Sequence, residues 1–367
     1  MFFEYVPALA SGIMGISGLL PLLSTITRPR HIRELAGLRA GIDGHVWLHR
    51  AVFANARAFA MGTLVDNHVK YFTKKCQYLL DHNVQPVVIF DGAMLPAKSL
   101  TNSTRSFDRA ISMGRAIGLH DAGNTQSAYT EFAKAAEIKH QMVTDIVSHL
   151  RTIGVDAFVA PYETDAQLSF LIREGVIDFA ISEDSDLLVY GCRRTLFKLD
   201  FRTGYGMEIA EPINSVTAFS NLSTDAVILA CVLAGCDYGP SIRGVGIRKA
   251  IDTAEYCNQF MHDSRFAARQ AVDALILRGI AVEDAQLLEN RIRISFMVFK
   301  HQVVFDPSKE IMTHLNAVNP TDMSESEIMF LGAIKTPEHA GDVYFNRIDP
   351  NSIHTVVPSR NVYIEGM

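Results

Sequence analysis

The chain has 367 residues, of which 48% are hydrophobic and 20% are charged. This composition supplies enough apolar side chains for a large core and excludes an intrinsically disordered protein. The formal net charge is −6, from 34 Lys and Arg against 40 Asp and Glu. An acidic balance of this kind usually argues against a nucleic-acid-binding protein.

The sequence also carries few signs of a membrane or secreted location. No apolar run approaches the ~20 residues that cross a bilayer, so we expect no membrane partner. The opening residues MFFEYVPALASGI lack a basic start and contain Glu4 and Pro7, which argues against a secretory signal. The five cysteines are scattered and lie mostly in apolar segments, which favours a reducing compartment over a disulfide framework.

Short β-branched runs alternate with longer helical patterns along the chain. This alternation predicts an α/β fold with a twisted, mostly parallel central sheet flanked by helices. In chain order the predicted elements are a strand at 39–43, a helix at 65–82, a strand at 86–91, an exposed, partly helical and mobile segment at 100–124, a helix at 128–153, a strand at 155–160, a helix at 165–174, strands at 178–182, 195–200 and 206–209, and a helix at 224–234. Beyond Asp237 we expect a glycine-punctuated loop and helix, then an all-helical region, and a loose tail from about Asn319.

Seven carboxylates fall at the ends of these predicted elements. They are Asp43 and Asp91 at the ends of the first two strands, Glu163 and Asp165 at the start of a helix after the third, Asp184 and Asp186 after the fourth, and Asp237 after a helix. Ligands gather at the carboxyl ends of parallel strands, so six of these acids would share one crevice, with Asp237 able to join them.

Such a cluster is unfavourable without cations. Two unit charges ~4 Å apart repel by about 4 kcal/mol at an effective dielectric of 20. The acids would therefore have raised pKa values or bind hard cations, and an all-oxygen ligand set favours Mg²⁺ or Mn²⁺. Taken singly, each acid has an ordinary explanation as a helix N-terminal residue, a turn residue or a solvated loop acid. Their joint placement favours the metal site.

Six segments resemble, in order, the signature blocks of the structure-specific 5′ nucleases, which include flap endonucleases, exonuclease 1 and excision-repair nucleases. The segments are MGISGLLPLL, AGIDGHVWLHR, PVVIFDG, VAPYETDAQL, ISEDSDLL and LAGCDYGPSIRGVGIRKA. Within this family, four features are most similar to exonuclease 1. They are the run from Trp47 to His49, the segment YGCRRTLFKLD, the sequence KTPEHAGDVYFNRIDPNS and the lack of a long insertion between the two nuclease blocks. The resemblance covers residues 14 to 352.

This resemblance implies a PIN-like nuclease core with a helical arch and a helix-two-turn-helix element. The core would span 14–350, after an extension at 1–13 and before a tail at 351–367. Within it we expect an N-terminal nuclease block at 14–112, an internal nuclease block at 150–236, a DNA-binding helix-two-turn-helix region at 237–280 and a helical C-terminal part at 281–350.

The resemblance also implies roles for individual residues. The seven carboxylates would hold two Mg²⁺ ions, or Mn²⁺, with Asp184 and Asp186 also counted as catalytic. Lys98 and Arg105 match a basic pair at the base of the arch that reaches the scissile phosphate. Further DNA-binding positions would be Gly15, His49, Arg109, Ser241, Arg243, Gly244, Gly246, Arg248 and Lys249, and Ser241 would also bind a potassium ion.

Each of these residues has a structural alternative. Lys98 and the arginines could be solvated loop charges, His49 a helix histidine, and Gly244 and Gly246 turn residues. Physical chemistry is compatible with the functional roles, because two metals can clamp an in-line displacement at phosphorus and cations can neutralise its transition state. Glycines also let backbone N–H groups approach phosphates.

The acidic balance is compatible with DNA binding once the acids are assigned to metals. Without the seven carboxylates the rest of the chain has a formal charge of +1. DNA contact would then depend on local cations, in the arch, at Arg193, Arg194, Lys198 and Arg202, and between Arg243 and Lys249. Phosphate contacts dominate such binding, so affinity should fall steeply with salt.

Two features depart from the family pattern. Thirteen residues precede Met14, and an extension there could obstruct a substrate near Gly15. Uncharged Leu100, Ser103, Ser106 and Phe107 stand in the arch where cations would be common. We therefore expect weaker capture of single-stranded 5′ ends.

The sequence predicts a Mg²⁺-dependent 5′→3′ double-stranded DNA exonuclease and 5′ flap endonuclease. It would act as a monomer in the nucleus, in DNA repair or recombination, on DNA with 5′ ends, nicks, gaps or 5′ flaps. One alternative is a catalytically impaired DNA-junction-binding protein that retains the fold. Another is an RNA-directed nuclease, which the duplex-gripping segment SIRGVGIRKA disfavours.

Overall fold

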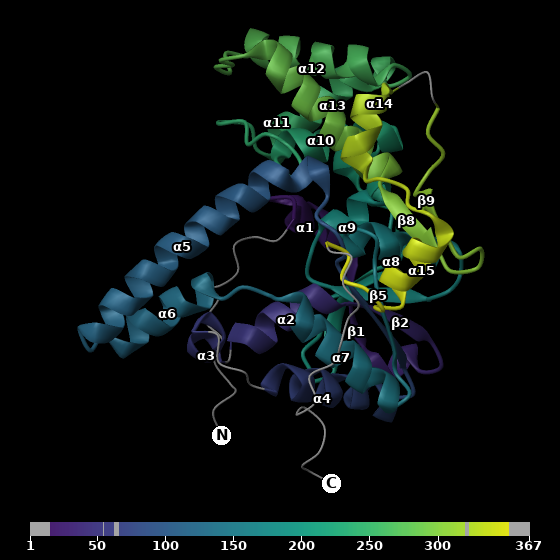
Figure 1. The fold of residues 1–367 in the computed structure, drawn as a ribbon. Helices are drawn as coiled ribbons and strands as arrows, with labels where there is room; N and C mark the ends of the chain where they lie inside the picture. Colours follow the sequence, from purple (N-terminus) through teal and green to yellow (C-terminus); the bar gives the residue numbers. More distant parts are fainter. Residues whose placement is uncertain (1–14, 54, 62–65, 320–322, 352–367) are drawn as a thin grey trace.

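A seven-stranded sheet forms the centre of the computed structural model, which describes residues 15–53, 55–61, 66–319 and 323–351 (Figure 1). The strands are β1 (Thr27–His31), β2 (Arg39–Asp43), β3 (Gln85–Phe90), β4 (Asp156–Val159), β5 (Phe179–Ser182), β6 (Thr195–Phe197) and β7 (Tyr205–Ile209). Their spatial order is β1-β7-β6-β5-β2-β3-β4. Strands β6, β5, β2, β3 and β4 pair in parallel, and β7 is antiparallel to β6 and β1. The predicted α/β class and mostly parallel sheet are confirmed.

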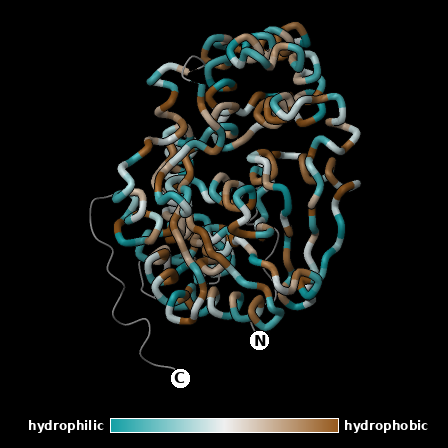
Figure 2. Tube along the Cα trace, turned by 90° about the vertical axis from the view of Figure 1, so that its right-hand side faces the viewer, coloured by the Kyte–Doolittle hydropathy of each residue, from teal (hydrophilic) through white to brown (hydrophobic). Residues whose placement is uncertain are grey.

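Helices cover both faces of the sheet, because successive strand residues point to opposite sides. Val88 and Phe90 of β3 pack with α2 (Gly44–Phe53), α4 (Asn67–Asp81) and α7 (His140–Thr152). Val87 and Ile89 face a second core that includes α8 (Thr164–Arg173), α9 (Asp186–Val189) and α10 (Thr224–Ala234). Figure 2 shows hydrophobic stretches running through the middle of the molecule. The sheet is therefore buried on both faces, which is typical of parallel strands.

Residues 99–135 form a helical hairpin that projects from this body (Figure 1). Its helices are α5 (Ser99–Asp121) and α6 (Thr125–Ala135), which pack together through Ala116, Ala128 and Phe132, with Ala56 of the short helix α3 (Ala56–Ala60). The segment expected to be exposed and partly helical at 100–124 is mostly exposed, and it is more helical than expected, because α5 is one continuous helix of 23 residues that ends at Asp121.

The helix expected at 128–153 is two helices, α6 and α7. The backbone leaves the helical conformation at Ala136, where φ is −65° and ψ is 128°. The two halves have different packing partners, because Phe132 contacts the helical hairpin and Ile146 contacts the sheet core. A continuous helix could not bury both apolar faces.

A second group of helices lies above the sheet in Figure 1. It contains α11 (Ile247–Cys257), α12 (Ser264–Leu277) and α13 (Ala285–His301), followed by a hairpin of β8 (Val303–Asp306) and β9 (Ile311–His314). The expectation of an all-helical region after Asp237 is therefore wrong at 303–314, where the run Val303–Phe305 is fully buried.

The expectation of a loose tail from Asn319 is also wrong for the described residues 323–351, which contain two helices. Helices α14 (Glu325–Ile328) and α15 (Pro337–Tyr344) lie within 323–351. The ring of Tyr344 stacks on Phe305 and Phe158, with centroid distances of 4.3 and 4.6 Å, so this segment packs on both β8 and β4. The predicted extension at 1–13, and all of the predicted tail except Asn351, lie outside the described residues.

The remaining short elements connect these parts. They are the helix α1 (Leu19–Leu22) and the 3-10 turns η2 (Leu23–Thr25), η3 (Ile32–Leu35), η4 (Pro96–Lys98), η5 (Ile213–Ser215), η6 (Thr217–Phe219), η7 (Asn258–Phe260) and η8 (Met329–Leu331). All five cysteines carry free thiols, as expected. In the described part of the chain, no helix has the length and apolar character needed to span a membrane.

Candidate active site

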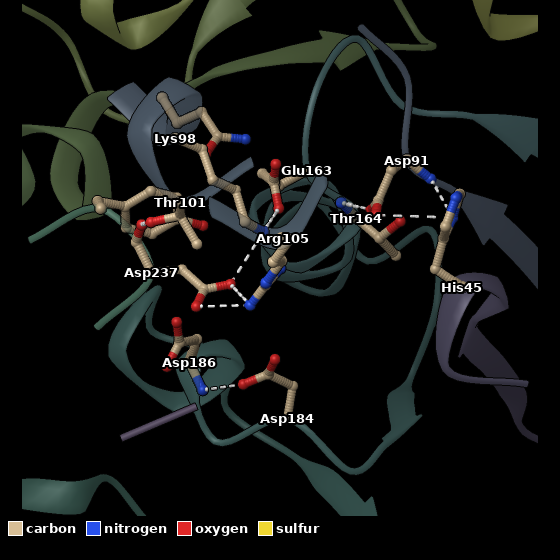
Figure 3. A network of polar contacts seen from close by, with 12 residues as sticks. His45, Asp91, Lys98, Thr101, Arg105, Glu163, Thr164, Asp184, Asp186 and Asp237 are labelled. Carbon is tan, nitrogen blue, oxygen red and sulfur yellow. Dashed lines mark hydrogen bonds and ion pairs between the residues drawn. The ribbon is translucent and has the colours of Figure 1, made fainter. Parts of the chain in front are cut away.

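The predicted carboxylates lie at the carboxyl edge of the parallel strands. Asp43 ends β2, Asp91 follows β3, Glu163 and Asp165 begin α8 after β4, Asp184 and Asp186 follow β5, and Asp237 follows α10. Figure 3 shows Asp91, Glu163, Asp184, Asp186 and Asp237 arranged around one region together with Lys98 and Arg105. The fold thus brings acids from five separate segments to one edge of the sheet, which we call the carboxyl edge.

Asp43 is buried and hydrogen-bonded at this edge. Asp43 is 5% exposed, and its carboxylate accepts hydrogen bonds from the Val46 N–H at 3.1 Å and the Ser182 hydroxyl at 2.9 Å. Burial and the charge of Asp91 nevertheless raise the pKa of Asp43 to about 7. Two hydrogen bonds therefore do not offset the burial of this carboxylate and the charge of Asp91.

Asp165 and Asp186 are less well satisfied. The Oδ1 atom of each is buried and has no hydrogen-bond partner in the described structure. Burial, followed by the charge of Asp184, raises the pKa of both carboxyls well above the usual range. Buried oxygens without donors are costly, so a cation is the natural missing partner for them.

Asp91 has the opposite electrostatic environment. Its Oδ1 accepts a hydrogen bond from the Thr164 N–H at 2.8 Å, and its Oδ2 lies 3.6 Å from Nδ1 of His45. Burial acts to raise the pKa of Asp91, but the charges of His45 and Lys98 outweigh it and lower that pKa. The ionised form of Asp91 is therefore favoured at this edge.

Two cations from η4 and α5 enter the carboxyl edge (Figure 3). Lys98 Nζ lies 2.6 Å from Oε2 of Glu163 and 3.2 Å from Oδ2 of Asp237. Arg105 Nη2 donates to both carboxylate oxygens of Asp237 at 2.9 Å. Burial acts to lower the pKa of Lys98, but the charges of Glu163 and Asp237 outweigh it and raise that pKa. The same two cations lower the pKa of Asp237, against the effect of its burial.

The donor set at this edge fits hard divalent cations. Within the described ranges, no three His, Cys, Asp or Glu side chains form a ready-made metal cluster, and Lys98 and Arg105 are paired with Glu163 and Asp237. The two unpartnered oxygens of Asp165 and Asp186 and the raised pKa values still indicate an unmet need for positive charge. The ligands are all carboxylate oxygens, which suits Mg²⁺ or Mn²⁺.

Gly15 lies directly against the carboxyl edge. A Cβ atom at Gly15 would be 2.3 Å from Oγ of Ser185 and 2.4 Å from Oδ1 of Asp184, and its φ of +81° also favours glycine. The next residue, Ile16, donates its N–H to Oγ of Ser185 at 2.8 Å. The first described residue is therefore packed beside an acid of the candidate site.

The other predicted DNA-binding residues lie around this edge or on a separate loop. His49 is exposed on α2, and Arg109 on α5 is paired with Glu137 at 3.3 Å. The remaining six follow α10: Ser241, Arg243, Gly244, Gly246, Arg248 and Lys249. Arg248 and Lys249 lie in the first turn of α11, and the other four lie in the loop before it. In this loop Gly244 has a φ of +84°, and its carbonyl accepts a hydrogen bond from Lys249 Nζ at 2.9 Å.

The sequence analysis missed several polar partners of these acids. Two of them hydrogen-bond a carboxylate directly: the Ser182 hydroxyl bonds Asp43, and the Thr164 N–H bonds Asp91. The other two bond the backbone of an acid: His45 Nδ1 accepts from the Asp91 N–H, and Thr101 Oγ1 donates to the Asp237 carbonyl at 2.7 Å. His45 and Thr164 could have been found, because each lies within two residues of a predicted acid. Thr101 could not, because its role depends on how α5 meets the end of α10.

Comparisons with known proteins agree with this geometry. Residues 14–111 match the XPG N-terminal domain and residues 154–237 match the XPG I-region. The chain is 32% identical to exonuclease 1 of Arabidopsis thaliana over 342 residues, which are 92% of this chain and 44% of that protein. It is 30% identical to the DNA damage-inducible protein DIN7 of Saccharomyces cerevisiae over 83% of this chain and 70% of that one.

A solved structure shares the fold. The Holliday junction-resolving enzyme GEN1, in complex with product DNA, Mg²⁺ and Mn²⁺ ions, superposes with a TM-score of 0.53 at 17% identity, over 80% of this chain and 66% of that chain. The present chain spans less than half the length of the Arabidopsis relative. From the two domain matches and the identity to DIN7, the chain belongs to the XPG family of structure-specific 5′ nucleases and resembles exonuclease 1.

Proposed function

We propose that the protein is a Mg²⁺-dependent 5′→3′ double-stranded DNA exonuclease and 5′ flap endonuclease. The observation that carries this proposal is the carboxyl edge, where seven acids meet and buried oxygens of Asp165 and Asp186 lack donors. A cation-dependent reaction explains why a fold would keep such an unfavourable cluster. The Mg²⁺ and Mn²⁺ ions in the GEN1 structure support the choice of metal.

The chemistry divides between metals and side chains. Two Mg²⁺ or Mn²⁺ ions held by the seven acids would activate the attacking water and stabilise the leaving oxygen. Lys98 and Arg105 would exchange their carboxylate partners for the scissile phosphate, since guanidinium and ammonium groups bind both kinds of anion. Their charge would then stabilise the additional negative charge of the transition state.

DNA would be held on both sides of this edge. We propose that His49 stacks on the nucleotide beside the cleavage site, that Arg109 contacts the strand in the arch, and that Gly15 marks the junction. The loop from Ser241 to Gly246, with Arg248 and Lys249, would contact the duplex backbone, with a potassium ion at Ser241. The protein would act on 5′ ends, nicks, gaps and flaps as a nuclear repair or recombination nuclease, and as a monomer.

A labelled 5′ flap and a labelled duplex with a recessed 5′ end test this function. With Mg²⁺ we expect short products from both, and none with EDTA. Asp184→Asn keeps the size of the side chain and removes its charge, so cleavage should fall by about 10²–10³-fold. Binding of the flap in EDTA, followed by fluorescence anisotropy, should stay within a factor of two or three of the unsubstituted protein.

One observation favours a second candidate, a junction-binding protein without cleavage. Lys98 and Arg105 already neutralise Glu163 and Asp237 in the described structure, which lowers the demand for metal at that end of the edge. Tight binding of the flap without products, in both Mg²⁺ and Mn²⁺, would select this candidate. Matched RNA substrates in the same assay test the RNA-directed alternative, for which we expect no products.

A further inference from the structure

A buried hydrogen-bond chain of three residues lies beneath the carboxyl edge. The Tyr190 hydroxyl is 2.9 Å from the Tyr238 hydroxyl and 2.7 Å from Oε1 of Gln302. Tyr238 directly follows Asp237, Tyr190 directly follows α9, and Gln302 lies between α13 and β8. We call these three residues the tyrosine chain. It links the C-terminal helical group to the acids of the edge.

The direction of the hydrogen bonds in the tyrosine chain follows from proton counting. A hydroxyl has one proton, and the amide oxygen of Gln302 only accepts. Tyr190 therefore donates to Gln302, and Tyr238 donates to Tyr190. All three residues are at most 6% exposed, so water does not compete for these bonds. Removing one hydroxyl would leave its partner unsatisfied in the interior.

The ring of Tyr238 is fixed at both ends. Its hydroxyl is held by Tyr190, and the edge of its ring contacts Phe299 at a centroid distance of 5.2 Å and an interplanar angle of 78°. The Lys98 ammonium lies 5.8 Å from the centroid of the same ring. Lys98 therefore sits between an aromatic wall and two carboxylates, Glu163 and Asp237.

We propose that the tyrosine chain positions Lys98 and Asp237 for cleavage, which makes Tyr238 and Tyr190 positioning residues. This inference rests on the nuclease function proposed above. The ring of Tyr238 limits where the Lys98 ammonium can move once a phosphate replaces Glu163 as the partner of that ammonium. Since Tyr238 and Asp237 are consecutive, the same hydroxyl bond also fixes the backbone that carries Asp237. Gln302 is the anchor that ties both to the start of β8.

Tyr238→Phe and Tyr190→Phe test this inference, because they remove a hydroxyl and keep the ring. We expect kcat on the 5′ flap to fall by about 10-fold, since small misplacements of reacting groups are costly. KM for DNA should be unchanged, because neither residue belongs to the proposed DNA-contacting set. The double variant should be no slower than the slower single variant, since one broken link already disables the chain.

Tyr129→Phe is the matched control. Tyr129 lies on α6 with none of the seven acids next to it in the chain, and its hydroxyl donates to the backbone carbonyl of Phe53. It should lose as much thermal stability as Tyr238→Phe and keep its kcat. If Tyr238→Phe matches this control in kcat, or if the two single effects multiply in the double variant, the inference is overturned.

A second measurement does not depend on cleavage. Acetic anhydride modifies free lysine amines, and mass spectrometry gives the rate at each lysine, with the exposed Lys74 as internal reference. Loosening of Lys98 in Tyr238→Phe should raise its rate relative to Lys74 several-fold, and Tyr129→Phe should not. An unchanged Lys98 rate contradicts the positioning role even if the protein proves to be a nuclease. A raised rate in a protein that cleaves nothing supports the positioning of Lys98 and overturns only the proposed function.

Discussion

Asp43 shows how the carboxyl edge depends on cations at the scale of one residue. Its carboxylate has two hydrogen-bond donors, yet burial and Asp91 raise its pKa to about 7. In an unfolded chain the pKa of Asp is about 3.9. A group whose pKa is higher in the folded state stabilises that state when protonated, and this stabilisation is lost as the pH rises through the folded pKa.

We therefore predict that the metal-free protein becomes less stable between about pH 5 and pH 7.5, because over this range the unfolded carboxyl is ionised while the folded one still loses its proton. In EDTA the Tm should fall by about 2–6 °C over this range. Saturating Mg²⁺ should remove most of the difference, because cations favour the ionised carboxylates. Differential scanning fluorimetry measures both effects.

Asp43→Asn is the control for this prediction, since an amide does not titrate. Its Tm in EDTA should depend less on pH than that of the unsubstituted protein, which separates Asp43 from the other titrating groups. A Tm in EDTA that rises from about pH 5 to pH 7.5 would contradict the assignment.

At this scale the sequence predicts which acids meet and misses how they are paired. The convergence of Asp43, Asp91 and Asp184 follows from one rule, that parallel strands end at the same edge. The pairing of Lys98 with Glu163 follows no local rule, because it depends on the angle at which α5 leaves the sheet. Side chains from separate elements meet only once tertiary packing fixes that angle.

Helix α5 shows a similar division at the scale of elements. Its inner side packs on α6 through Ala116, and its outer side carries Gly114 and Gly118, where an added Cβ would meet nothing within 4 Å. Glycine in a helix costs about 1 kcal/mol relative to alanine. The two glycines therefore lower the intrinsic stability of the projecting helix.

We predict that Gly114→Ala with Gly118→Ala stiffens α5. Both sites have room for the methyl group, so each substitution should stabilise the helix by about 1 kcal/mol. Hydrogen exchange of the amides of α5 should slow by roughly 10-fold or more, as read by mass spectrometry. Gly123→Ala makes the same chemical change at a φ of +77°, where alanine is strained, and should speed exchange at the end of α5 instead.

The cations of α5 support a separate prediction about salt. Arg105 and Arg109 are paired with Asp237 and Glu137, so a bound strand must break these pairs to reach them. Weak, weakly salt-dependent capture of 5′ single strands should result. Ser106→Lys adds an unpaired cation at an exposed site of the same helix, and should steepen the slope of log K against log salt by about 0.7–0.9.

Ser106→Gln is its matched control, with a comparable length and no charge. Its slope should equal that of the unsubstituted protein. Equal slopes for Ser106→Lys and Ser106→Gln in a flap-binding titration would show that the strand does not pass this part of α5.

Among elements, those with a strong local pattern were predicted well. The boundaries of β2 and α10 agree with the sequence prediction to the residue, since each has an apolar centre with a polar or charged residue at its start. Strand β1 was missed because Arg28, Pro29 and Arg30 do not read as a strand; it forms only by pairing with β7. The break between α6 and α7 was also missed, because it is decided by two distant packing partners.

At the scale of the whole molecule, the position of Gly15 links the chain's first described residue to the acids. Any residues attached before Gly15 must leave from beside Asp184. They would compete with DNA for the space in front of the carboxyl edge. We predict that a protein starting at Gly15 has a kcat/KM on the 5′ flap several-fold higher than one starting at Met1.

The measurement is a parallel titration of both proteins with the same flap. Gly15→Ala in the shorter protein is the control for the contact itself, and it should lose activity, because a Cβ there collides with Ser185 and Asp184. Equal kcat/KM values for the two starting points would show that residues before Gly15 do not obstruct the site.

The two borders of the sheet have a consequence for association between molecules. At one border, Pro29 in β1 has no N–H to donate and Arg28 is exposed. At the other border, the ring of Tyr344 in α15 stacks on Phe158 of β4. Charge and proline on an outer strand discourage a foreign strand from extending the ladder. The outer strand β1 therefore discourages edge-to-edge aggregation of copies of this protein through their sheets.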